Sequence, residues 1–548
     1  PPSLHDSLMA RLDRIPDVKG VAQIAACIGR DFAYRLLAAV AGLPDAQLTS
    51  VLEKLAAAEL VFRRGSPLEA RYTFKHALVR DAAYESLLRS RRIDIHSQLA
   101  AILEAEADSG VAVAPEMLAQ HHAAGGNTDR AVDYWKIAGD QARDRYANRE
   151  ASVSYAKGLE LLAGLPESAD RDNTELDLRL AASRPILVGD GYTSAAFEQN
   201  ATRIAGLARS VGDDVILWRA LYDLGRFGNQ RADSLGMEGV NIEGIGLEII
   251  KIGERLGDNC AVAAGLYTLV GNKLLRADFS ATKKLCARCA ALGLSAQEQL
   301  DVADNFQAAI GCGLANAQLH WHLGYIWQAR SMANGAMQQA REMDRPFTLA
   351  FAFQRTAILR QLERLSGPAL QAISQFLDVH KQYPAPHWLP WVMIIRAWSH
   401  MAENRMDAAL TDLERAWPLW YDRGGAEFLG PFFRCISAEV LLAVCQYDRA
   451  ATLLDEAFAL QESTSQRHWD AELHRTKAAL ALGQAQASAE AEHELRTALS
   501  ISRSQEAKSL ELRAARDLAR LWAERGERQQ AQDLLAPVYD WFTEGLDT

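Results

Sequence analysis

A Cys-x-x-Cys pair is the first place in this sequence where residue type and spacing could support chemistry. Cys286 and Cys289 have the spacing at which two thiolates can bind one zinc ion. No second cysteine pair or histidine pair follows at a suitable distance, and residues 281–293 read as a helix. Since a buried free cysteine packs as a small hydrophobic side chain, we expect both residues in the core and no metal site in this chain.

The histidine pairs give no better metal site. His320 and His322 are two residues apart, and His121 and His122 are neighbours. Side chains at these spacings point apart on a helix, so neither pair is a convincing set of ligands.

Catalytic motifs for nucleotides are also missing from the sequence. The segment LVGNKLLR (269–276) comes nearest to a phosphate-binding loop, but it lacks the leading glycine and the Ser or Thr that would bind magnesium. Paired metal-binding aspartates on strands, which a cyclase would need, are not evident. We therefore expect this chain not to be an enzyme and to hold no cofactor of its own.

The bulk composition narrows the class of partner. A net charge of −11 disfavours a nucleic-acid-binding surface, which needs excess Lys and Arg. No apolar run approaches the roughly 20 residues of a membrane span. Seven scattered cysteines disfavour a disulfide framework, so we expect a cytoplasmic protein. The chain starts at Pro1 without an initiator methionine, and we expect it to be part of a longer protein.

Alanines at a fixed period dominate the second half of the chain. Six of them follow one another at intervals of 40, 40, 41, 41 and 40 residues, and each has another alanine twelve residues before it. The six pairs are Ala317 and Ala329, Ala357 and Ala369, Ala397 and Ala409, Ala438 and Ala450, Ala479 and Ala491, and Ala519 and Ala531. A period of this length predicts a solenoid of stacked helical hairpins.

Turn residues support this register. Gly324, Asn404 and Gly526 each lie five residues before the later alanine of a pair, and Gly and Asn tolerate the left-handed conformation that ends a helix. The first helix (A) of each repeat should hold the first alanine and the second helix (B) the later one. This pattern resembles the tetratricopeptide repeat, with about 40 residues in place of roughly 34. HEAT-like hairpins are the structural alternative.

Side chains beside the core alanine of helix A are the candidate partner-binding residues, because in tetratricopeptide arrays they line the inner groove. They comprise aromatic residues followed by a basic end: Trp321, Phe351, Trp391, Trp398, Phe432, Arg513, Arg516 and Arg520. Such a groove would suit a peptide, or a ligand with an apolar body and an acidic end. The alternative is that these long helices need aromatic filler between repeats.

The repeat pattern continues upstream with less regularity. Ala119 pairs with Ala131 across Gly126, and Gly139 pairs with Ala151. Because these two registers overlap, a helix at 128–145 must pack on both of its neighbours. We assign no register between 164 and 300, and we expect a Gly-rich loop at 228–246.

The first hundred residues predict a different module. Short helices at 4–15, 18–29, 32–42 and 45–60 precede two β-type runs around a turn at 65–70, and another helix follows at 77–90. Helices followed by a two-stranded wing make a winged helix. Helix 45–58 would read DNA, but QLTSVLEKLAAAE offers one lysine and two acidic residues, which is a poor composition for the groove.

The segment YTFKHALVRDAAYESLLRSRR (72–92) resembles the end of the winged-helix domain in STAND-class signalling ATPases. In that class a Met-His-Asp motif precedes a Leu-Val-Arg-Asp-like helix, and its histidine contacts the β-phosphate of ADP. Lys75-His76-Ala77 stands at the motif here, so the resemblance gives His76 the role of nucleotide sensing. The alternative is a surface or capping histidine after a strand.

Further segments extend the resemblance over nearly the whole chain, most strongly at 3–165 and 470–548. ELVFRRG, AVDYWKIAGDQA, AKSLELRAARDLARLWAERG and LLAPVYDWFTEGLDT look like one bacterial family of large predicted ATPases, often fused to class III adenylate/guanylate cyclases. The resemblance implies a P-loop ATPase and a cyclase upstream of Pro1. ATP or ADP and magnesium would then bind those modules and not this chain.

We therefore predict an all-α protein, with a winged-helix-like N-terminal module bearing a short β-hairpin wing, followed by a tetratricopeptide-like α-solenoid. The expected domains are 1–95 (winged helix), 96–165 (first repeats), 166–305 (irregular repeats) and 306–548 (regular solenoid). The predicted function is a non-catalytic sensor that binds a protein, peptide or small-molecule effector and controls its own upstream nucleotide-binding domain. A scaffold without switching and a DNA-binding regulator are the alternatives. We expect no membrane or nucleic-acid partner, and leave oligomerisation open.

Overall fold

The computed structural model describes residues 18–66, 69–191, 194–231, 241–302, 307–422, 427–484 and 488–545. They form two compact units, unit 1 (residues 1–189) and unit 2 (residues 190–548). The helix expected at 4–15 lies outside the described residues. The domain boundaries expected after 95 and 165 fall inside unit 1, and that after 305 falls inside unit 2. No described helix has the length and hydropathy needed to span a membrane.

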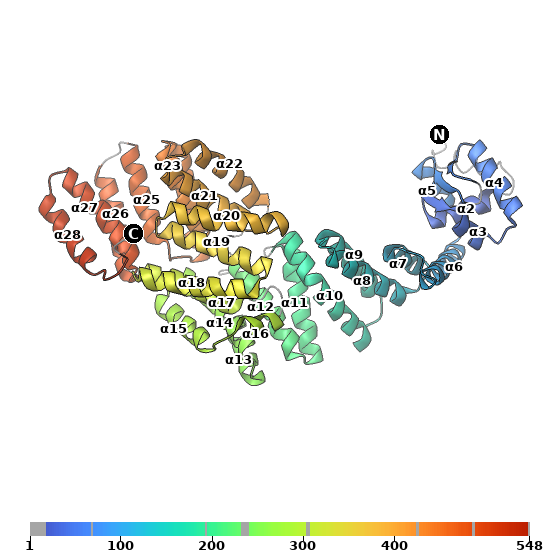
Figure 1. Cartoon of the computed structure of the whole chain (residues 1–548), viewed down its shortest axis with the longest axis horizontal. Helices are drawn as coiled ribbons and strands as arrows, with labels where there is room; N and C mark the ends of the chain where they lie inside the picture. Colours follow the sequence, from blue (N-terminus) through green and yellow to red (C-terminus); the bar gives the residue numbers. More distant parts are fainter. Residues whose placement is uncertain are drawn as a thin grey trace. The chain divides into compact units, whose positions relative to one another are not determined.

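Unit 1 begins with the winged-helix-like module (Figure 1). Its elements are α2 (Val18–Ile28), β1 (Asp31–Ala33), α3 (Tyr34–Ala41), α4 (Asp45–Ala57), β2 (Val61–Arg64), β3 (Arg71–Phe74) and α5 (Ala77–Glu85). The wing is a three-stranded antiparallel sheet of order β1-β3-β2, with Phe32 and Arg63 opposite Tyr72 on its two sides. The predicted hairpin is therefore present, with one strand more.

Two helix limits in this module differ from prediction. The helix expected to start at Phe32 starts at Tyr34, because residues 31–33 pair with β3 and the buried Phe32 ring stacks on Tyr72 at 5.6 Å. The helix expected to run to 90 ends at Glu85, and Arg89 opens the next helix. At Phe32 a tertiary contact outweighs a helical propensity that is weak over so short a window.

The remainder of unit 1 consists of paired helices. These are α6 (Arg89–Asp108), α7 (Pro115–Ala124), α8 (Thr128–Asp144), α9 (Asn148–Ala163) and α10 (Ala169–Asp190). Helix α8 packs on both α7 and α9, as the overlapping registers predict. Gly126 turns the chain in the left-handed region at φ +81°, and a Cβ on Gly139 would lie 2.5 Å from the Tyr155 ring.

Buried histidines join the module to the first helical pair. His96 of α6 and His121 of α7 face each other with their Nδ1 atoms 2.9 Å apart, and Tyr84 of α5 lies 3.2 Å from His96 Nε2. One imidazole must donate and the other accept, so the contact is lost when both rings are protonated. Burial lowers the pKa of His121 to about 4, with further lowering by His96 and His122.

Unit 1 should therefore lose stability in mild acid. The pKa of His121 is lower in the folded chain than in the unfolded chain. Its contribution to stability is therefore fully present above the unfolded pKa of about 6.5 and is lost as the pH falls toward the folded pKa of about 4. We expect a loss of about 1–2 kcal/mol at pH 5 relative to pH 7, and a flatter profile for His121→Gln. The measurement is limited proteolysis at increasing urea concentration. Mass spectrometry of the cleaved peptides reports the unfolding of unit 1 separately from that of unit 2. The exposed His493→Gln is the control, and an equally flat profile for it would contradict the assignment.

Unit 2 opens with six helices of less regular length. They are α11 (Ala195–Val211), α12 (Asp214–Arg231), α13 (Ile242–Leu256), α14 (Asn259–Leu275), α15 (Phe279–Ala291) and α16 (Ala296–Val302). The Gly-rich loop expected at 228–246 is helical at both of its ends, since α12 runs to Arg231 and α13 starts at Ile242. Residues 232–240 are not among those described.

The regular repeats follow as six hairpins. The A helices are α17 (Ala308–His322), α19 (Pro346–Leu362), α21 (Leu389–Ala402), α23 (Gly430–Ala443), α25 (Asp470–Gly483) and α27 (Lys508–Glu524). The B helices are α18 (Ile326–Met343), α20 (Ser366–Gln382), α22 (Met406–Asp422), α24 (Tyr447–Thr464), α26 (Ser488–Ser504) and α28 (Arg528–Asp540). The repeat solenoid predicted from the alanine period is confirmed.

The alanine register holds with one exception. Eleven of the twelve alanines are buried, but Ala479 is exposed and Ala478 takes its place in the core. Five hairpins have three-residue turns, whereas four residues separate α25 from α26 in the sequence. The extra residue moves the core position of α25 back by one. In the other turns the middle residue has positive φ, including Gly324, Asn404 and Gly526 as predicted, and also Arg364 and Cys445.

The repeats curve until their last hairpin meets the first. Each A helix contacts the A helix of the next repeat, so the A helices form the tightly spaced inner layer (Figure 1). Ser509 of α27 donates its hydroxyl to the Trp321 carbonyl of α17. The tail beyond α28 reaches α18, where Glu544 accepts from the backbone N–H of Trp327 at 3.0 Å and thereby caps that helix.

Close packing at the alanines can be tested in a single helix. Replacing the fully buried Ala450 with Leu should destabilise unit 2 by about 1–3 kcal/mol, because a larger side chain forces α23 and α24 apart. Urea unfolding measures the change. Ala459→Leu, at an exposed position of the same helix, should change stability by less than about 0.5 kcal/mol. Equal effects at both positions would show that close approach is not the constraint.

Candidate functional site

A cavity of about 50 Å³ with polar and aromatic lining lies inside unit 2, among α12, α14, α17, α19 and α21. Its polar lining consists of Arg226, Asn229, Tyr267, Thr268, Gln307, Gln354 and Arg355. Its aromatic lining consists of Phe351, Trp388, Trp391 and Phe428. The cavity could hold one or two water-sized groups, since a water occupies about 30 Å³ of the liquid.

Glycines let the helices around the cavity approach one another. A Cβ on Gly311 of α17 would lie 2.3 Å from the Tyr267 ring, and one on Gly225 of α12 would lie 2.6 Å from Thr268. These glycines let Tyr267 lie against the backbone of α17 at the cavity wall. On the same wall, Asn229 donates to the Thr268 carbonyl at 3.0 Å, so this part of the lining is satisfied.

Gln354 and its neighbours leave polar atoms directed at the cavity. Gln354 is 1% exposed, and neither atom of its amide has a hydrogen-bond partner among the described residues. Gln307 Oε1 is likewise without a partner there. Arg355 donates from Nη2 to Gln318 Oε1 at 2.8 Å, while its buried Nη1 has none. Buried polar groups are normally paired, so this concentration of unmatched atoms marks a site.

The cavity is electropositive. Burial lowers the pKa of Arg226 to about 9, and burial also lowers the pKa of Arg355. Asp223 Oδ1 lies 3.5 Å from Arg226 Nη1. Burial raises the pKa of Asp223 to about 7. The two guanidinium groups give this side of the cavity a cationic character.

Aromatic rings form the opposite wall. Trp391 stacks on Phe428, with centroids 5.9 Å apart and planes at 13°, and Phe351 lies 5.7 Å from Trp388. The guanidinium of Arg355 lies 5.9 Å from the Phe428 ring centre, within the range of a cation–π contact. The site therefore combines a cationic side with an aromatic side.

The predicted groove residues lie in three different settings. Phe351 and Trp391 line the cavity. Trp321, Trp398 and Phe432 are buried in contacts between helices, the setting expected of aromatic filler. Arg513 lies inside the protein over the Trp321 ring, at 4.9 Å, whereas Arg516 and Arg520 are exposed beside Asp517. Contact of these residues with a partner stays a prediction.

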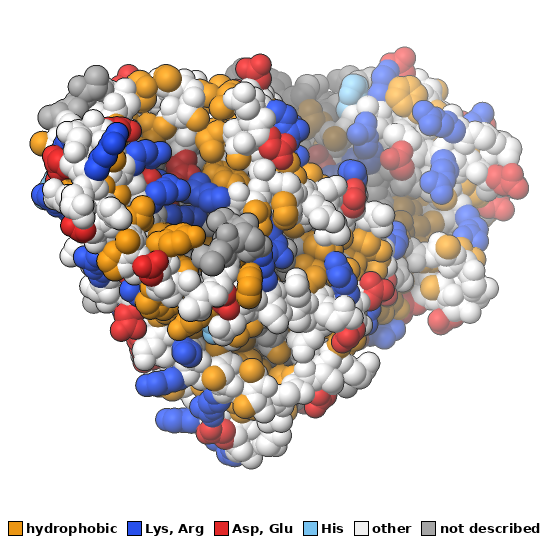
Figure 2. Space-filling model, turned by 60° about the vertical axis from the view of Figure 1, so that its left-hand side comes forward, with side chains coloured by type: hydrophobic (Ala, Val, Ile, Leu, Met, Phe, Trp, Pro, Cys, Tyr) orange, Lys and Arg blue, Asp and Glu red, His pale blue; other side chains and the backbone are white. Residues whose placement is uncertain are grey.

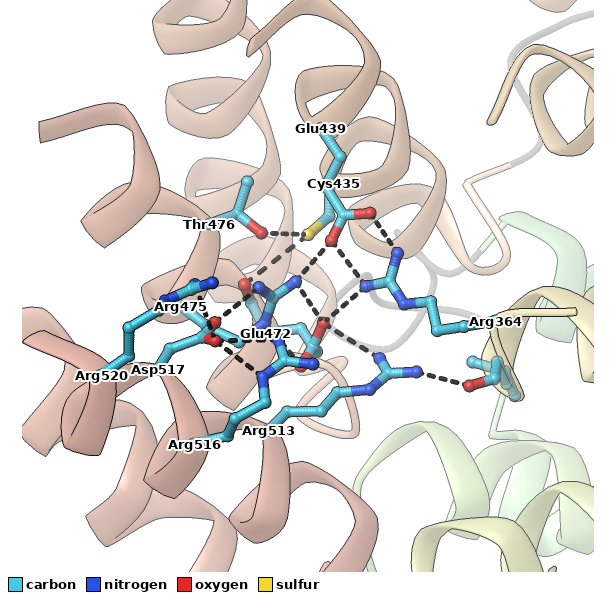
Figure 3. A network of polar contacts seen from close by, with 11 residues as sticks. Arg364, Cys435, Glu439, Glu472, Arg475, Thr476, Arg513, Arg516, Asp517 and Arg520 are labelled. Carbon is cyan, nitrogen blue, oxygen red and sulfur yellow. Dashed lines mark hydrogen bonds and ion pairs between the residues drawn. The ribbon is translucent and has the colours of Figure 1, made fainter. Parts of the chain in front are cut away.

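A buried network of ion pairs surrounds Arg513 (Figure 3). Arg475 contacts Glu439, Glu472 and Asp517, at 2.5, 3.0 and 3.0 Å. Arg364, in the turn after α19, pairs with Glu439 through both of its terminal nitrogens. Arg513 donates to Glu472 and to the Leu362 carbonyl. The charges of these three arginines and three carboxylates balance. Together the six side chains join the end of α19 to α23, α25 and α27.

Glu472 is the carboxylate on which most of this network converges. It is 1% exposed and accepts from Arg475 and Arg513, with Arg364 at 3.6 Å. Although burial alone would raise its pKa, these three guanidinium groups hold the pKa of Glu472 well below its ordinary value. The network therefore stays charged at neutral pH. Figure 2 shows Lys and Arg side chains gathered in a hollow on this side of unit 2, with hydrophobic side chains around them.

Unit 1 carries the other predicted site residue. His76 is exposed and directly precedes α5, without capping that helix through its side chain. A separate surface groove on the module is acidic, since Asp45 and Glu53 of α4 and nearby Glu69 line it. Such a groove opposes binding of DNA phosphates by α4.

The Cys-x-x-Cys pair lies in the core. Cys286 and Cys289 of α15 are buried, and Cys286 donates to the Cys312 carbonyl of α17 at 3.7 Å. Burial raises the pKa of Cys286 to about 12, which keeps it a thiol. Among the described residues no group of three His, Cys, Asp or Glu side chains is placed to hold a metal ion.

Comparison between the A helices gives only a weak signal for the cavity in the sequence. Gln354-Arg355 stands three and two residues before Ala357. The same positions are Leu314-Ala315 in α17, Ile394-Ile395 in α21 and Cys435-Ile436 in α23. They are polar again in α25 (Thr476-Lys477) and α27 (Arg516-Asp517), so a polar pair at these positions does not by itself single out the cavity.

Comparison with known proteins gives distant relatives. No family model matches the chain. The uncharacterized protein R02095 of Rhizobium meliloti (strain 1021) is 23% identical over 540 residues, covering 94% of this chain and 50% of that protein. The chain thus spans about half the length of the curated relative it matches.

Solved structures that resemble the chain are helical-repeat proteins. One is a STAND protein with a tetratricopeptide repeat sensor from Pyrococcus horikoshii, at 12% identity, covering 97% of this chain and 64% of that one, with a TM-score of 0.30. Another is a Rap protein complexed with Competence and Sporulation Factor, which is 10% identical in sequence. That match covers 68% of this chain and 99% of the Rap protein, with a TM-score of 0.46. A third is yeast Tom70, which is 13% identical in sequence. That match covers 76% of this chain and 93% of Tom70, with a TM-score of 0.32. The helical hairpins themselves define a tetratricopeptide-like repeat protein.

The ion-pair network should be essential to unit 2. Glu472→Gln removes the charge shared by three buried arginines, and we expect a loss of about 3–5 kcal/mol in urea unfolding. The matched control is Asp378→Asn. Asp378 forms an ion pair with Lys381, and the two side chains are 68% and 75% exposed. That variant should lose less than about 1 kcal/mol. A small effect of Glu472→Gln would mean that the network does not hold the repeats together.

Proposed function

We propose that this chain is a non-catalytic regulatory module whose repeat unit binds an effector and controls a nucleotide-binding ATPase or cyclase of the same, longer protein. The observation that carries the proposal is the cavity beside Gln354, where a fully buried amide with no hydrogen-bond partner among the described residues lines a space inside the helical array. A purely structural solenoid would gain stability from an apolar residue there.

The mechanism we propose is a shift of population between two states. An effector changes an equilibrium only by its different affinity for the two states, so it must bind better to the released state than to the resting one. Closure of the repeats through Glu472 and α27 gives unit 2 an arrangement that can be opened or tightened as a whole. The ATP or ADP and magnesium would bind the upstream domain.

His76 is the residue we propose for sensing the nucleotide. Its side chain is exposed and is not used to cap α5. Leu78, two residues further on, is 54% exposed, so an apolar contact with another domain could form beside it. This role comes from the resemblance of residues 72–92 to STAND-class ATPases and is supported by the accessibility of the side chain.

The two alternatives have less support. A DNA-binding regulator conflicts with the acidic groove along α4 and with the net charge of −11. A scaffold without switching accounts for the repeats but gives no role to the unmatched groups at Gln354. Both alternatives predict that nucleotide turnover elsewhere in the protein is independent of His76.

The experiment uses the longer protein with its upstream segment. If His76 contacts bound ADP, His76→Ala should speed release of a fluorescent ADP analogue about tenfold, which corresponds to the loss of one hydrogen bond to a charged group. His493→Ala, an exposed histidine in unit 2, is the control and should release ADP at the wild-type rate.

Equal release from all three proteins would refute nucleotide sensing by His76. A longer protein without any phosphate-binding loop would refute control of an ATPase altogether. A shift of duplex DNA by the chain at low salt would favour the regulator that binds DNA.

A further inference from the structure

The inner face of the A helices becomes exposed toward the end of the array. This face bears the residues three before, one after and four after each core alanine, which form one stripe on a helix. The residue directly after the core alanine is buried in α17, α19 and α21, partly buried in α23, and exposed in α25 and α27. Those residues are, in order, Gln318, Ile358, Trp398, Glu439, Ala479 and Arg520. The last two repeats therefore leave a stretch of the inner face accessible to a partner.

Two exposed arginines on this stretch share one carboxylate. Arg516 and Arg520 of α27 are 59% and 67% exposed, and both contact Asp517, at 2.8 and 3.2 Å. Asp517 is 11% exposed and also pairs with Arg475 of α25 at 3.0 Å. Figure 3 shows the three arginine side chains around this single carboxylate. Each guanidinium has five N–H groups, so Arg516 and Arg520 keep donors for a further acceptor.

Positive charge is in excess at this place. Arg516 and Arg520 add two charges to a network in which three arginines and three carboxylates balance. Exposed arginines in the earlier helices of unit 2 are instead matched one to one with a carboxylate: Arg209 with Glu248, Arg255 with Asp214, and Arg288 with Glu254. Like charges held together raise the local positive potential, which favours an acidic partner.

The spacing of the two arginines favours an extended peptide. Arg516 and Arg520 are four residues apart on α27, which corresponds to a rise of about 6 Å along the helix. Alternate residues of an extended chain point to the same side and are about 6.6 Å apart. Acidic side chains at the first and third positions of a peptide that runs along α27 therefore face Arg516 and Arg520 together.

The next level of the inner face is apolar. Leu482 of α25 and Ala523 of α27 each stand four residues after a core alanine, and both are exposed. Helices α25 and α27 are in contact, so these two side chains border the same stretch. Glu524 is also exposed at this level and would repel a third acidic residue. The fifth position of the peptide, which faces this level, should therefore be apolar.

We propose that this stretch of the inner face binds an extended peptide with two acidic residues at alternate positions and an apolar residue two positions beyond them. Arg516 and Arg520 hold the carboxylates, and Leu482 packs against the apolar residue. The inference names a class of effector and rests on the proposed binding of an effector by the repeat unit. A nucleic-acid strand is disfavoured, because its bases need aromatic rings to stack on and the apolar residues exposed beside the arginines are Ala479, Leu482 and Ala523.

Fluorescence anisotropy of labelled peptides with the purified full chain tests the proposal. The probe is Gly-Ser-Glu-Ser-Glu-Ser-Leu-Ser-Gly, and we expect a Kd below about 100 µM at low salt, weakening as salt is added. The same peptide with both glutamates changed to glutamine should bind at least about tenfold more weakly, since its amides carry no charge. A peptide with the two glutamates side by side should lose as much, because neighbouring residues of an extended chain point to opposite sides.

Two pairs of substitutions locate the site. Arg516→Gln with Arg520→Gln should reduce affinity for the probe at least about tenfold, while the melting temperature stays within about 2 °C because both side chains are exposed. Arg255→Gln with Arg288→Gln is the matched control. It removes two charges that are 60% and 47% exposed elsewhere in unit 2, and should bind the probe as the wild type does.

A single substitution tests the apolar position. Leu482→Ser should weaken binding of the probe about fivefold, since an apolar contact is lost. It should leave unchanged the binding of a probe in which serine replaces the leucine. Equal weakening of both probes would overturn the contact with Leu482.

The outcomes separate this inference from the proposed function. Equal binding of the glutamate and glutamine peptides, equal loss in both pairs of substitutions, or tighter binding of a single-stranded DNA oligonucleotide would each overturn the peptide site. Peptide binding that the substitutions of Arg516 and Arg520 remove, without any effect of the peptide on ADP release from the longer protein, would uphold the site and overturn control of the nucleotide-binding domain through it. Failure of peptide binding, with ADP release still dependent on His76, would overturn the peptide site alone.

Discussion

Glu472 has to remain ionised inside the protein, and the arrangement of the last repeats follows from that requirement. A lone buried carboxylate would be neutralised or would unfold the site, because transfer of a charge from water costs far more than a domain can supply. Arg475, Arg513 and Arg364 come from α25, α27 and the turn after α19 to surround it. These helices can satisfy Glu472 together only when the array curves back on itself.

The curvature that serves this network also creates the cavity. Helix α19 takes part in both, since Gln354 and Arg355 lie in its middle and Arg364 lies two residues beyond its end. Helix α14 lines the cavity as well. The Leu275 carbonyl at the end of this helix accepts from the backbone N–H groups of Arg467 and His468. A ligand that moves α14 or α19 would therefore act on elements that also hold the closure.

Local rules accounted for most of the repeat architecture. Small residues at the crossing of two helices, and a left-handed residue in each of the five described turns, repeat at a fixed period that can be recognised without knowledge of the rest of the chain. The rule erred at Ala479 because one extra turn residue shifts the register, and at Phe32 because a strand partner far along the chain outweighed helix propensity. In both cases the deciding feature lay outside the short sequence window from which the position was predicted.

The sequence by itself determined the stacked hairpins, the winged-helix-like module and the absence of recognisable catalytic motifs, because these depend on spacing within about forty residues. Only the tertiary structure decided that Trp321, Trp398 and Phe432 are buried, that Arg513 belongs to an ion network, and that Gln354 and Arg355 line a cavity with Arg226. The physical reason is that partners such as Ser509 and Trp321 are 188 residues apart. Their meeting depends on the small rotation between successive repeats, which accumulates along the array and which no single repeat encodes.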